Sequence, residues 1–195
     1  MNLKTSGAEA TIESRDRHVF KRRIPKRYRI KELDEQLRRE RTKYEAKMIA
    51  EARRSGIPTP IIHDVTDYDI AMEYLDGPQL KCVIDVELCK RIGELVGKLH
   101  SSGIIHGDLT TSNMIVSQGR IHLIDFGLSY FDKSVEARGV DVHVLFQTFE
   151  STHDEHRALI NAFIEGYKKT FDGANDVLQR VKSIESRGRY RTERL

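Results

Sequence analysis

The sequence predicts an α+β protein of two lobes, a small β-rich N-terminal lobe with one long helix and a mostly helical C-terminal lobe. Two observations support this class. Before residue 74, patterns typical of short strands surround one helical pattern at residues 31–54. After it, helical patterns dominate and leave one pair of short strands. We expect an N-terminal lobe at residues 1–73, a C-terminal lobe at 74–185 and a basic tail at 186–195.

In the N-terminal lobe, residues 4–23 read as a small β element, and Ile24-Pro25 breaks it. Apolar residues recur at helical spacing through residues 31–54, and Gly56 and Pro58 end that helix. Further strands are expected at residues 61–65 and 69–72.

The C-terminal lobe carries its clearest helix at residues 85–101, where five apolar residues form one stripe. Gly188 and several arginines follow the last helix, so we expect the tail not to fold alone. The later helices are expected from Val140 onward, at residues 155–171 and at residues 173–184.

Residues 106–127 hold the side chains suited to chemistry. Asp108 is followed five positions later by Asn113, and Asp125 comes twelve positions after that, opening Asp-Phe-Gly. Phosphoryl transfer from ATP needs metal ions that neutralise the phosphates and a carboxylate that orients the nucleophile. Asn113 and Asp125 are hard oxygen ligands that suit Mg²⁺. We therefore predict an ATP and Mg²⁺ site, with Asp108 as the catalytic carboxylate beside the acceptor.

The same Asp-Phe-Gly could be an ordinary turn, but its context favours the catalytic interpretation. Residues 114–117 and 120–124 read as two short strands around the turn Gln118-Gly119. This hairpin places Asn113 and Asp125 at one edge. The stretch resembles the catalytic and metal-binding loops of protein kinases.

Lys21 follows two apolar residues in a strand pattern and resembles the kinase lysine that holds the α- and β-phosphates. The alternative is one more cation in a basic run. Gly7 lies where kinases carry a glycine-rich loop, although the full G-x-G-x-x-G is absent. Either Glu45 or Glu40 on the long helix would orient Lys21, and the spacing does not decide between them.

Residues 71–77 resemble a kinase hinge. We expect Met72, Glu73 and Leu75 to bind the nucleotide, with the adenine edge paired to the backbone at Glu73 and Leu75. The alternative is a plain strand end before the Gly-Pro turn. That alternative explains the turn but not the catalytic motif that follows one helix later.

The chain departs from protein kinases in and after the catalytic motif. Gly107 replaces an arginine that usually contacts a phosphorylated activation loop, and His106 is expected to be structural. Only residues 128–139 separate the metal loop from the next helix, so the activation segment is truncated. Asp141 resembles the aspartate that caps the catalytic-loop backbone, and it is also a normal helix cap.

The composition fits a folded chain with a charged surface, since 38% of its 195 residues are apolar and 32% are charged. Residues 15–54 carry a balance of +9 and residues 55–179 a balance of −9. The basic ends indicate a solvated face or a footprint for nucleic acid. Cys82 and Cys89 are expected to be buried free thiols, which indicates a cytoplasmic location. No apolar run is long enough to span a membrane.

Several segments together resemble one family, the small atypical kinase/ATPase subunit of the KEOPS (EKC) complex. The most specific are HGDLTTSN at residues 106–113 and SRGRYR at residues 186–191. The resemblance implies that Glu45 is the helix glutamate. It also implies a role in threonylcarbamoyladenosine modification of tRNA. The implied partners are a sugar-kinase-like threonylcarbamoyltransferase subunit, a small subunit bound to the N-terminal lobe, and tRNA through the complex.

Other functions share this motif. A stand-alone Ser/Thr protein kinase is disfavoured by the truncated activation segment. A small-molecule phosphotransferase usually carries an extended helical substrate lobe, and few residues remain after Gly127 to build one. A scaffold without activity does not explain why Lys21, Asp108, Asn113 and Asp125 are all present.

Overall fold

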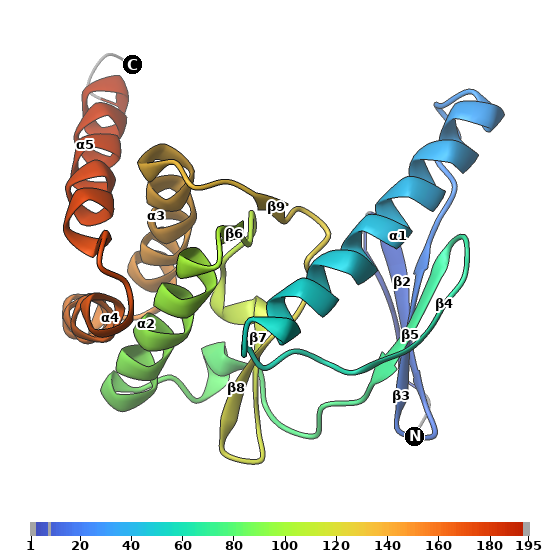
Figure 1. Cartoon of the computed structure of the whole chain (residues 1–195), viewed down its shortest axis with the longest axis horizontal. Coiled ribbons are helices and arrows are strands. Elements are labelled where there is room, and N and C mark those ends of the chain that lie inside the picture. The colour runs from blue at the N-terminus through green and yellow to red at the C-terminus, as the bar shows by residue number, and fades with distance from the viewer. Residues whose placement is uncertain (1–2, 8, 193–195) are drawn as a thin grey trace.

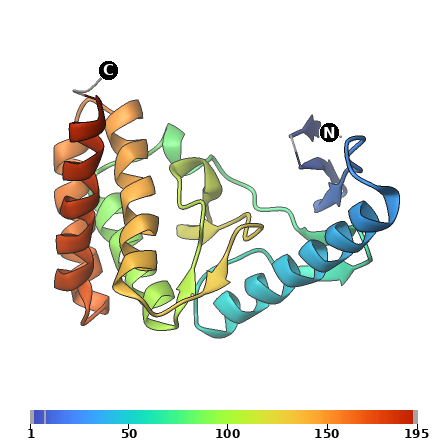
Figure 2. The same ribbon diagram turned by 90° about the horizontal axis from the view of Figure 1, so that it is seen from above.

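The computed structural model describes residues 3–7 and 9–192. Its N-terminal part is a five-stranded antiparallel sheet crossed by one helix, α1 (Lys31–Arg54) (Figure 1). Seen from above, the sheet and α1 lie on one side of the molecule and the bundle of later helices on the other (Figure 2). The sheet has the order β1 (Leu3–Ser6), β2 (Ala10–Arg15), β3 (His18–Arg23), β5 (Asp69–Glu73), β4 (Ile62–Val65).

The predicted long helix is confirmed at both ends. Its C-terminus is closed by two backbone bonds, from Gly56 N–H to Arg53 O and from Ile57 N–H to Ala52 O. This pattern needs a left-handed residue after the helix, and Gly56 has φ +80°. The last turns of α1 pack against the main core, where Met48, Ile49 and Ala52 are buried, whereas Leu33 and Tyr44 nearer its N-terminus are exposed.

Among its described residues, the C-terminal part contains four α-helices, two short 3₁₀ helices (η1 and η2) and two short two-stranded sheets. The predicted hairpin is confirmed, with β7 and β8 paired in register from Met114–Leu123 to Ser117–Arg120. Gln118 and Gly119 both have positive φ, as a two-residue hairpin turn requires. The elements are η1 (Leu80–Cys82), α2 (Val86–Ser101), β6 (Ile104–Ile105), η2 (Thr111–Asn113), β7 (Met114–Ser117), β8 (Arg120–Leu123), β9 (Tyr130–Phe131), α3 (Val135–Thr152), α4 (His156–Thr170) and α5 (Ala174–Thr192).

Two predicted helix ends were wrong. Helix α3 begins at Val135 rather than near Val140, because the Ser134 side chain caps it by accepting from Ala137 N–H. Helix α5 continues to Thr192 rather than ending near Ile184. A single interior glycine costs a helix only about 1 kcal/mol, and the arginines around Gly188 are good helix formers.

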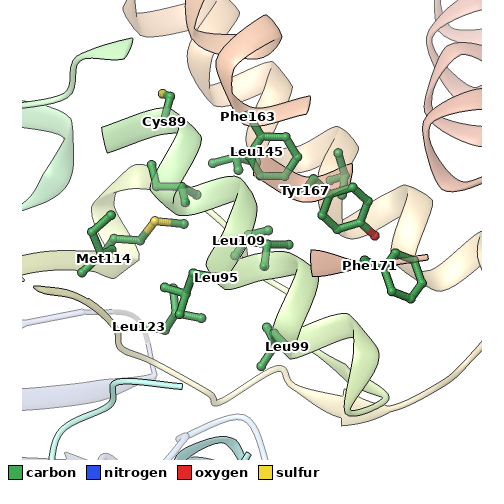
Figure 3. Packing of buried hydrophobic residues seen from close by; sticks show 14 of the residues in the cluster. Cys89, Leu95, Leu99, Leu109, Met114, Leu123, Leu145, Phe163, Tyr167 and Phe171 are labelled. Carbon is green, nitrogen blue, oxygen red and sulfur yellow. The ribbon is translucent and has the colours of Figure 1, made fainter. Parts of the chain in front are cut away.

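The main core lies in the helical part, where α2 and α4 pack closely (Figure 3). Glycines permit this approach, because a Cβ on Gly166 would lie 1.9 Å from Lys90 O and a Cβ on Gly93 would lie 2.1 Å from Phe163 O. Of the two cysteines, Cys89 is buried as predicted, but Cys82 is exposed. None of the described helices is apolar over a length that would cross a membrane. The core includes Leu95, Leu99, Leu145, Phe163, Tyr167 and Phe171.

Candidate functional site

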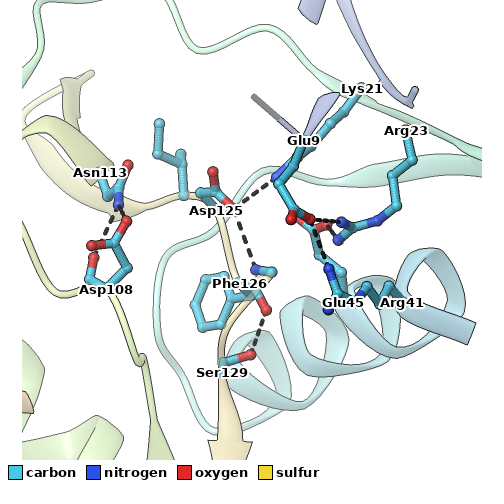
Figure 4. Close-up of polar contacts among 12 residues, drawn as sticks. Glu9, Lys21, Arg23, Arg41, Glu45, Asp108, Asn113, Asp125, Phe126 and Ser129 are labelled. Carbon is cyan, nitrogen blue, oxygen red and sulfur yellow. Dashed lines mark hydrogen bonds and ion pairs between the residues drawn. The ribbon is translucent and has the colours of Figure 1, made fainter. Parts of the chain in front are cut away.

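Lys21 on β3 lies between two carboxylates from distant parts of the chain (Figure 4). Its Nζ is 2.6 Å from Glu45 Oε1 on α1 and 2.7 Å from Asp125 Oδ1 after β8. Glu45 is therefore the partner of Lys21, whereas Glu40 accepts from Gln36 on an exposed face. The pairing that spacing left open is decided by the packing of α1 against the sheet.

These contacts set the charge states of the site. Burial alone would lower the pKa of Lys21, but the carboxylates of Glu45 and Asp125 outweigh it and raise that pKa. Burial would likewise raise the pKa of Asp125, and the nearby Lys21 ammonium holds it below its usual value. Both groups are therefore ionised at neutral pH. A carboxylate that stays ionised and partly exposed is suited to a cation.

The catalytic-loop residues Asp108 and Asn113 lie against each other. The Asn113 amide donates to Asp108 Oδ2 at 2.8 Å and to the Asp108 carbonyl at 2.9 Å. Ile124 N–H donates to Asn113 O at 3.0 Å. This backbone bond joins the start of β7 to the residue before Asp125, so both predicted metal ligands come to one edge of the hairpin.

Asp125 has a left-handed backbone, with φ 61°. Such a conformation is rare for a residue other than glycine and often occurs at functional sites. The following Phe126 is buried and its ring centroid lies 4.9 Å from that of His106. Ser129 Oγ donates to Phe126 O at 2.6 Å. The loop is thus anchored by Phe126 while the Asp125 side chain remains 43% exposed.

Asp141 fixes the catalytic loop through its backbone. Its carboxylate accepts from His106 N–H at 2.8 Å and from Gly107 N–H at 2.9 Å, and it also contacts the His100 ring. It therefore caps this backbone as predicted, but it lies within α3 and is not that helix's N-cap, which is Ser134. His106 is buried, and burial lowers its pKa, which fits the structural role predicted for it.

Gly107 shows why this chain has no arginine after His106. Its φ is +80°, and a Cβ would lie 2.2 Å from Leu128 O. The residue after the metal loop therefore rests directly on the catalytic-loop backbone. A side chain at Gly107 would push the two loops apart.

Most of the predicted site residues line a cavity of about 280 Å³, while Asp108 does not line it and is bonded to the lining residue Asn113. Lys21, Glu45, Asn113 and Asp125 line its polar end. This volume is near the lower end for small-ligand pockets, roughly 300 Å³. The hinge positions Met72, Glu73 and Leu75 also line it, together with Ile12, Val19, Ile49, Ile115 and Ile124.

Gly7 does not line this cavity among the described residues. Its N–H donates to Ala10 O at 2.9 Å within the turn between β1 and β2. A role for Gly7 at the phosphates stays a prediction. So do the backbone contacts of adenine at Glu73 and Leu75.

Two residues of the site were not predicted from the sequence. The Arg23 guanidinium donates to Glu45 Oε2 at 2.6 Å. Glu9 accepts from Arg41 at 2.8 Å and lies 3.5 Å from Arg23. The available signal was the period of two in a strand, which puts Lys21 and Arg23 on one face. This period did not single out Arg23, because most of its neighbours in the sequence are also basic.

Comparison with known proteins identifies the family of the chain. Residues 8–160 match the RIO domain family. A probable serine/threonine-protein kinase BUD32 homolog of Archaeoglobus fulgidus is 49% identical over 184 residues, which cover 94% of each chain. The KEOPS complex subunit Bud32 of Pyrococcus abyssi is 38% identical over 98% of this chain and 97% of its own. The chain belongs to the RIO-domain family, in its Bud32 group.

Some Bud32-group relatives are longer. The probable bifunctional tRNA threonylcarbamoyladenosine biosynthesis protein of Methanosarcina mazei is 55% identical over 190 residues. The match covers 95% of this chain but 35% of that protein. The chain thus spans about a third of the length of the bifunctional relatives it matches.

Solved structures of low sequence identity share the fold. The Rio2 kinase of Chaetomium thermophilum, in a complex with ADP/Mg²⁺ and phosphoaspartate, has a TM-score of 0.66 at 17% identity, over 96% of this chain and 70% of its own. APH(2")-IIa, in its ternary complex with streptomycin and ATP, has a TM-score of 0.62 at 12% identity, over 93% of this chain and 81% of its own. The predicted protein-kinase-like fold is confirmed. Bud32-group membership supports an ATP-dependent phosphotransferase type of activity.

Proposed function

We propose that this chain is an atypical Ser/Thr kinase and ATPase that uses Mg·ATP and supports threonylcarbamoyladenosine modification of tRNA in a KEOPS-type complex. The observation that carries the proposal is the convergence of Lys21, Glu45, Asn113 and Asp125 on one cavity, with Asp108 bonded to Asn113. The names of the Bud32-group relatives supply the biological process.

The residues fit a nucleotide with a divalent cation. In the described residues, no group of three His, Cys, Asp or Glu side chains could hold a metal alone. Mg²⁺ in phosphoryl-transfer sites typically takes one or two protein ligands and completes its shell with phosphates and water. Asn113 and Asp125 would provide those ligands. The bound ion would neutralise the phosphate oxygens.

The chain's own groups would do the remaining work. Lys21, oriented by Glu45, would hold the phosphates. Asp108 would accept a hydrogen bond from the attacking hydroxyl or water, and Asn113 keeps the Asp108 side chain in place. The apolar walls around Met72 would exclude water from adenine.

The testing experiment measures Mg²⁺-dependent ATP turnover by the full chain, with and without the sugar-kinase-like subunit and tRNA. Asp125→Asn should abolish turnover while the protein stays folded, and Asp64→Asn on the exposed sheet should not. Stimulation by the subunit and tRNA supports the KEOPS assignment. Wild-type turnover in a folded Asp125→Asn protein would contradict the metal-ligand role.

A further inference from the structure

Arg23 is a buried arginine with no part in the roles described above. It lies two residues after Lys21 on β3, so both side chains leave the same face of the strand. Arg23 binds Glu45 Oε2 and Lys21 binds Glu45 Oε1, each at 2.6 Å. The side chains of Arg23 and Glu45 are only 6% and 1% exposed. Glu45 is thus a deeply buried carboxylate with two cations rather than one.

The two cations are not equivalent, because Lys21 is shared with Asp125 at 2.7 Å. In the proposed function Lys21 also binds phosphate groups, so it shares its positive charge between Glu45 and other anions. Removing one partner from a buried ion pair leaves an uncompensated charge, which is strongly unfavourable. The planar fork of Arg23 can hold Oε2 of Glu45 whichever group Lys21 faces.

Arg23 also reaches the turn between β1 and β2. Its Nη1 lies 3.5 Å from Glu9 Oε2, and Glu9 in turn accepts from Arg41 on α1 at 2.8 Å. On another side, a Cβ on Gly127 would lie 3.4 Å from Arg23 Nη2. Arg23 therefore contacts or borders the helix, the metal loop and the turn where kinases carry a glycine-rich loop (Figure 4).

We propose that Arg23 is a positioning residue for phosphoryl transfer. It holds Oε2 of the Glu45 carboxylate so that Oε1 can orient Lys21, and through Glu9 it anchors the turn that leads into β2, whose Ile12 lines the cavity. This turn lacks the G-x-G-x-x-G pattern of protein kinases. The Arg23–Glu9 ion pair would help to fix its position, a task for which kinases use a glycine-rich backbone. The inference rests on the proposed function, because it assigns Lys21 to the phosphates.

The test compares Arg23→Met, Arg23→Lys and Arg22→Met. Arg22 is a matched control, because it is the adjacent arginine on β3 and pairs with Asp69 on the exposed side of the sheet. Arg23→Met should lower kcat by about ten- to a hundredfold, the effect expected from a small displacement of a reacting group. KM for ATP should rise less than in Glu9→Gln, because Glu9 keeps its 2.8 Å contact with Arg41 when Arg23 is replaced. Arg23→Lys should recover part of the loss, and Arg22→Met should behave like the wild type.

A second readout separates this inference from the proposed function. An acyl-phosphate derivative of ATP labels a lysine when the amine attacks its acyl carbon and displaces the nucleotide, so it reports the position of Lys21 without turnover. Arg23→Met should slow this labelling. If the wild type shows no ATP turnover but Arg23→Met is still labelled more slowly than the wild type, the role of Arg23 is kept and the proposed function is removed.

Equal kcat in Arg23→Met and the wild type, or equal losses in Arg23→Met and Arg22→Met, would overturn the positioning role. If Arg23→Met does not fold, Arg23→Lys and Glu9→Gln carry the test. Glu9→Gln should raise KM for ATP more than it lowers kcat, because the turn loses its anchor. A folded Glu9→Gln protein with wild-type KM would overturn the link through the turn.

Discussion

The two lobes hold their parts of the site by different means. Among the described residues of the N-terminal lobe, the buried apolar cluster beside the sheet is small and consists of Ala46, Ile70 and Met72, with the partly buried Val19 and Ile62 packed against it. Lys21 and Glu45 are held there by ion pairs. In the C-terminal lobe the catalytic loop is bonded to a buried carboxylate and lies on a continuous apolar core.

This difference predicts different responses to substitution. A change to an N-terminal ion pair should alter the chemistry while the main core keeps the chain folded. A change to a C-terminal packing contact should lower the free energy of unfolding before it affects the chemistry, since cores tolerate little change in volume. The expected effects below run from the largest to the smallest.

After loss of the metal ligand Asp125, Lys21→Met should have the largest effect on activity. Removing a cation aimed at the phosphates should lower kcat by about 10²–10³-fold, or roughly 3–4 kcal/mol, as for other charge-stabilising donors. ATP turnover measures it, and ADP affinity should fall less because the apolar walls remain. Lys43→Met, which removes an exposed lysine of α1, is the control. A similar loss of turnover in both variants would mean that Lys21 acts only through surface charge.

Gly166→Ala should have the largest effect on stability. The new Cβ would lie 1.9 Å from Lys90 O, so α4 would have to move away from α2. Overpacking of this kind typically costs about 1–3 kcal/mol, and contact with backbone puts this case at the upper end. Urea unfolding provides the measurement.

The control for Gly166 is Gly139→Ala on α3. Its Cβ would meet the flexible stem of Arg180 at 2.8 Å, and alanine favours the helix by about 1 kcal/mol. Equal stability of the two variants would show that the α2–α4 contact is less tight than the structure indicates.

The sequence predicted the elements whose signals are local. Gly56 and Pro58 marked the end of α1, and Gln118-Gly119 marked the hairpin that brings Asn113 and Asp125 together. The start of α3 was predicted too late because Asp141 also fits a helix cap, whereas Ser134, seven residues earlier, caps the helix. Asp141 instead binds the catalytic-loop backbone.

Contacts between distant segments were not predictable in the same way. The choice of Glu45 over Glu40 depends on how α1 is rotated against the sheet, and spacing does not determine that rotation. Arg23 was indistinguishable from the exposed arginines around it until burial separated them. The contact of Gly107 with Leu128 likewise appears only when the two loops are placed together.

Gly107→Ala should have an intermediate effect, because this glycine lies where the catalytic loop meets the residue after the metal loop. A left-handed alanine costs roughly 1–2 kcal/mol, and the contact with Leu128 O adds to it. Both kcat and stability should fall. Gly119→Ala is the control, since its φ is +70° but no atom lies within 4 Å of its Cβ. If Gly107→Ala and Gly119→Ala lose equal stability, the left-handed backbone alone explains the loss and the contact with Leu128 O adds nothing.

The smallest expected effect concerns pH and His106. Burial lowers the pKa of this ring below its ordinary 6.5, so the folded chain resists protonating it while the unfolded chain accepts the proton. The free energy of unfolding should therefore fall as pH drops below about 6.5, by at most roughly 1.4 kcal/mol per pH unit for one proton. Asp125 and Asp141 have lowered pKa values and titrate below this range.

His106→Gln should reduce this pH dependence, because glutamine does not titrate and its amide can still donate to Ile124 O, which His106 Nε2 contacts at 3.1 Å. Some dependence should remain, since burial also lowers the pKa of His122. Urea unfolding between pH 7 and 5 measures it, with the exposed His63→Gln as control. An unchanged pH dependence in a folded His106→Gln protein would show that protonation acts elsewhere. A smaller pH dependence of the free energy of unfolding in His106→Gln would show that acid destabilises the protein by protonating the buried His106 ring of the catalytic loop, and not by breaking the ion pairs of the N-terminal lobe.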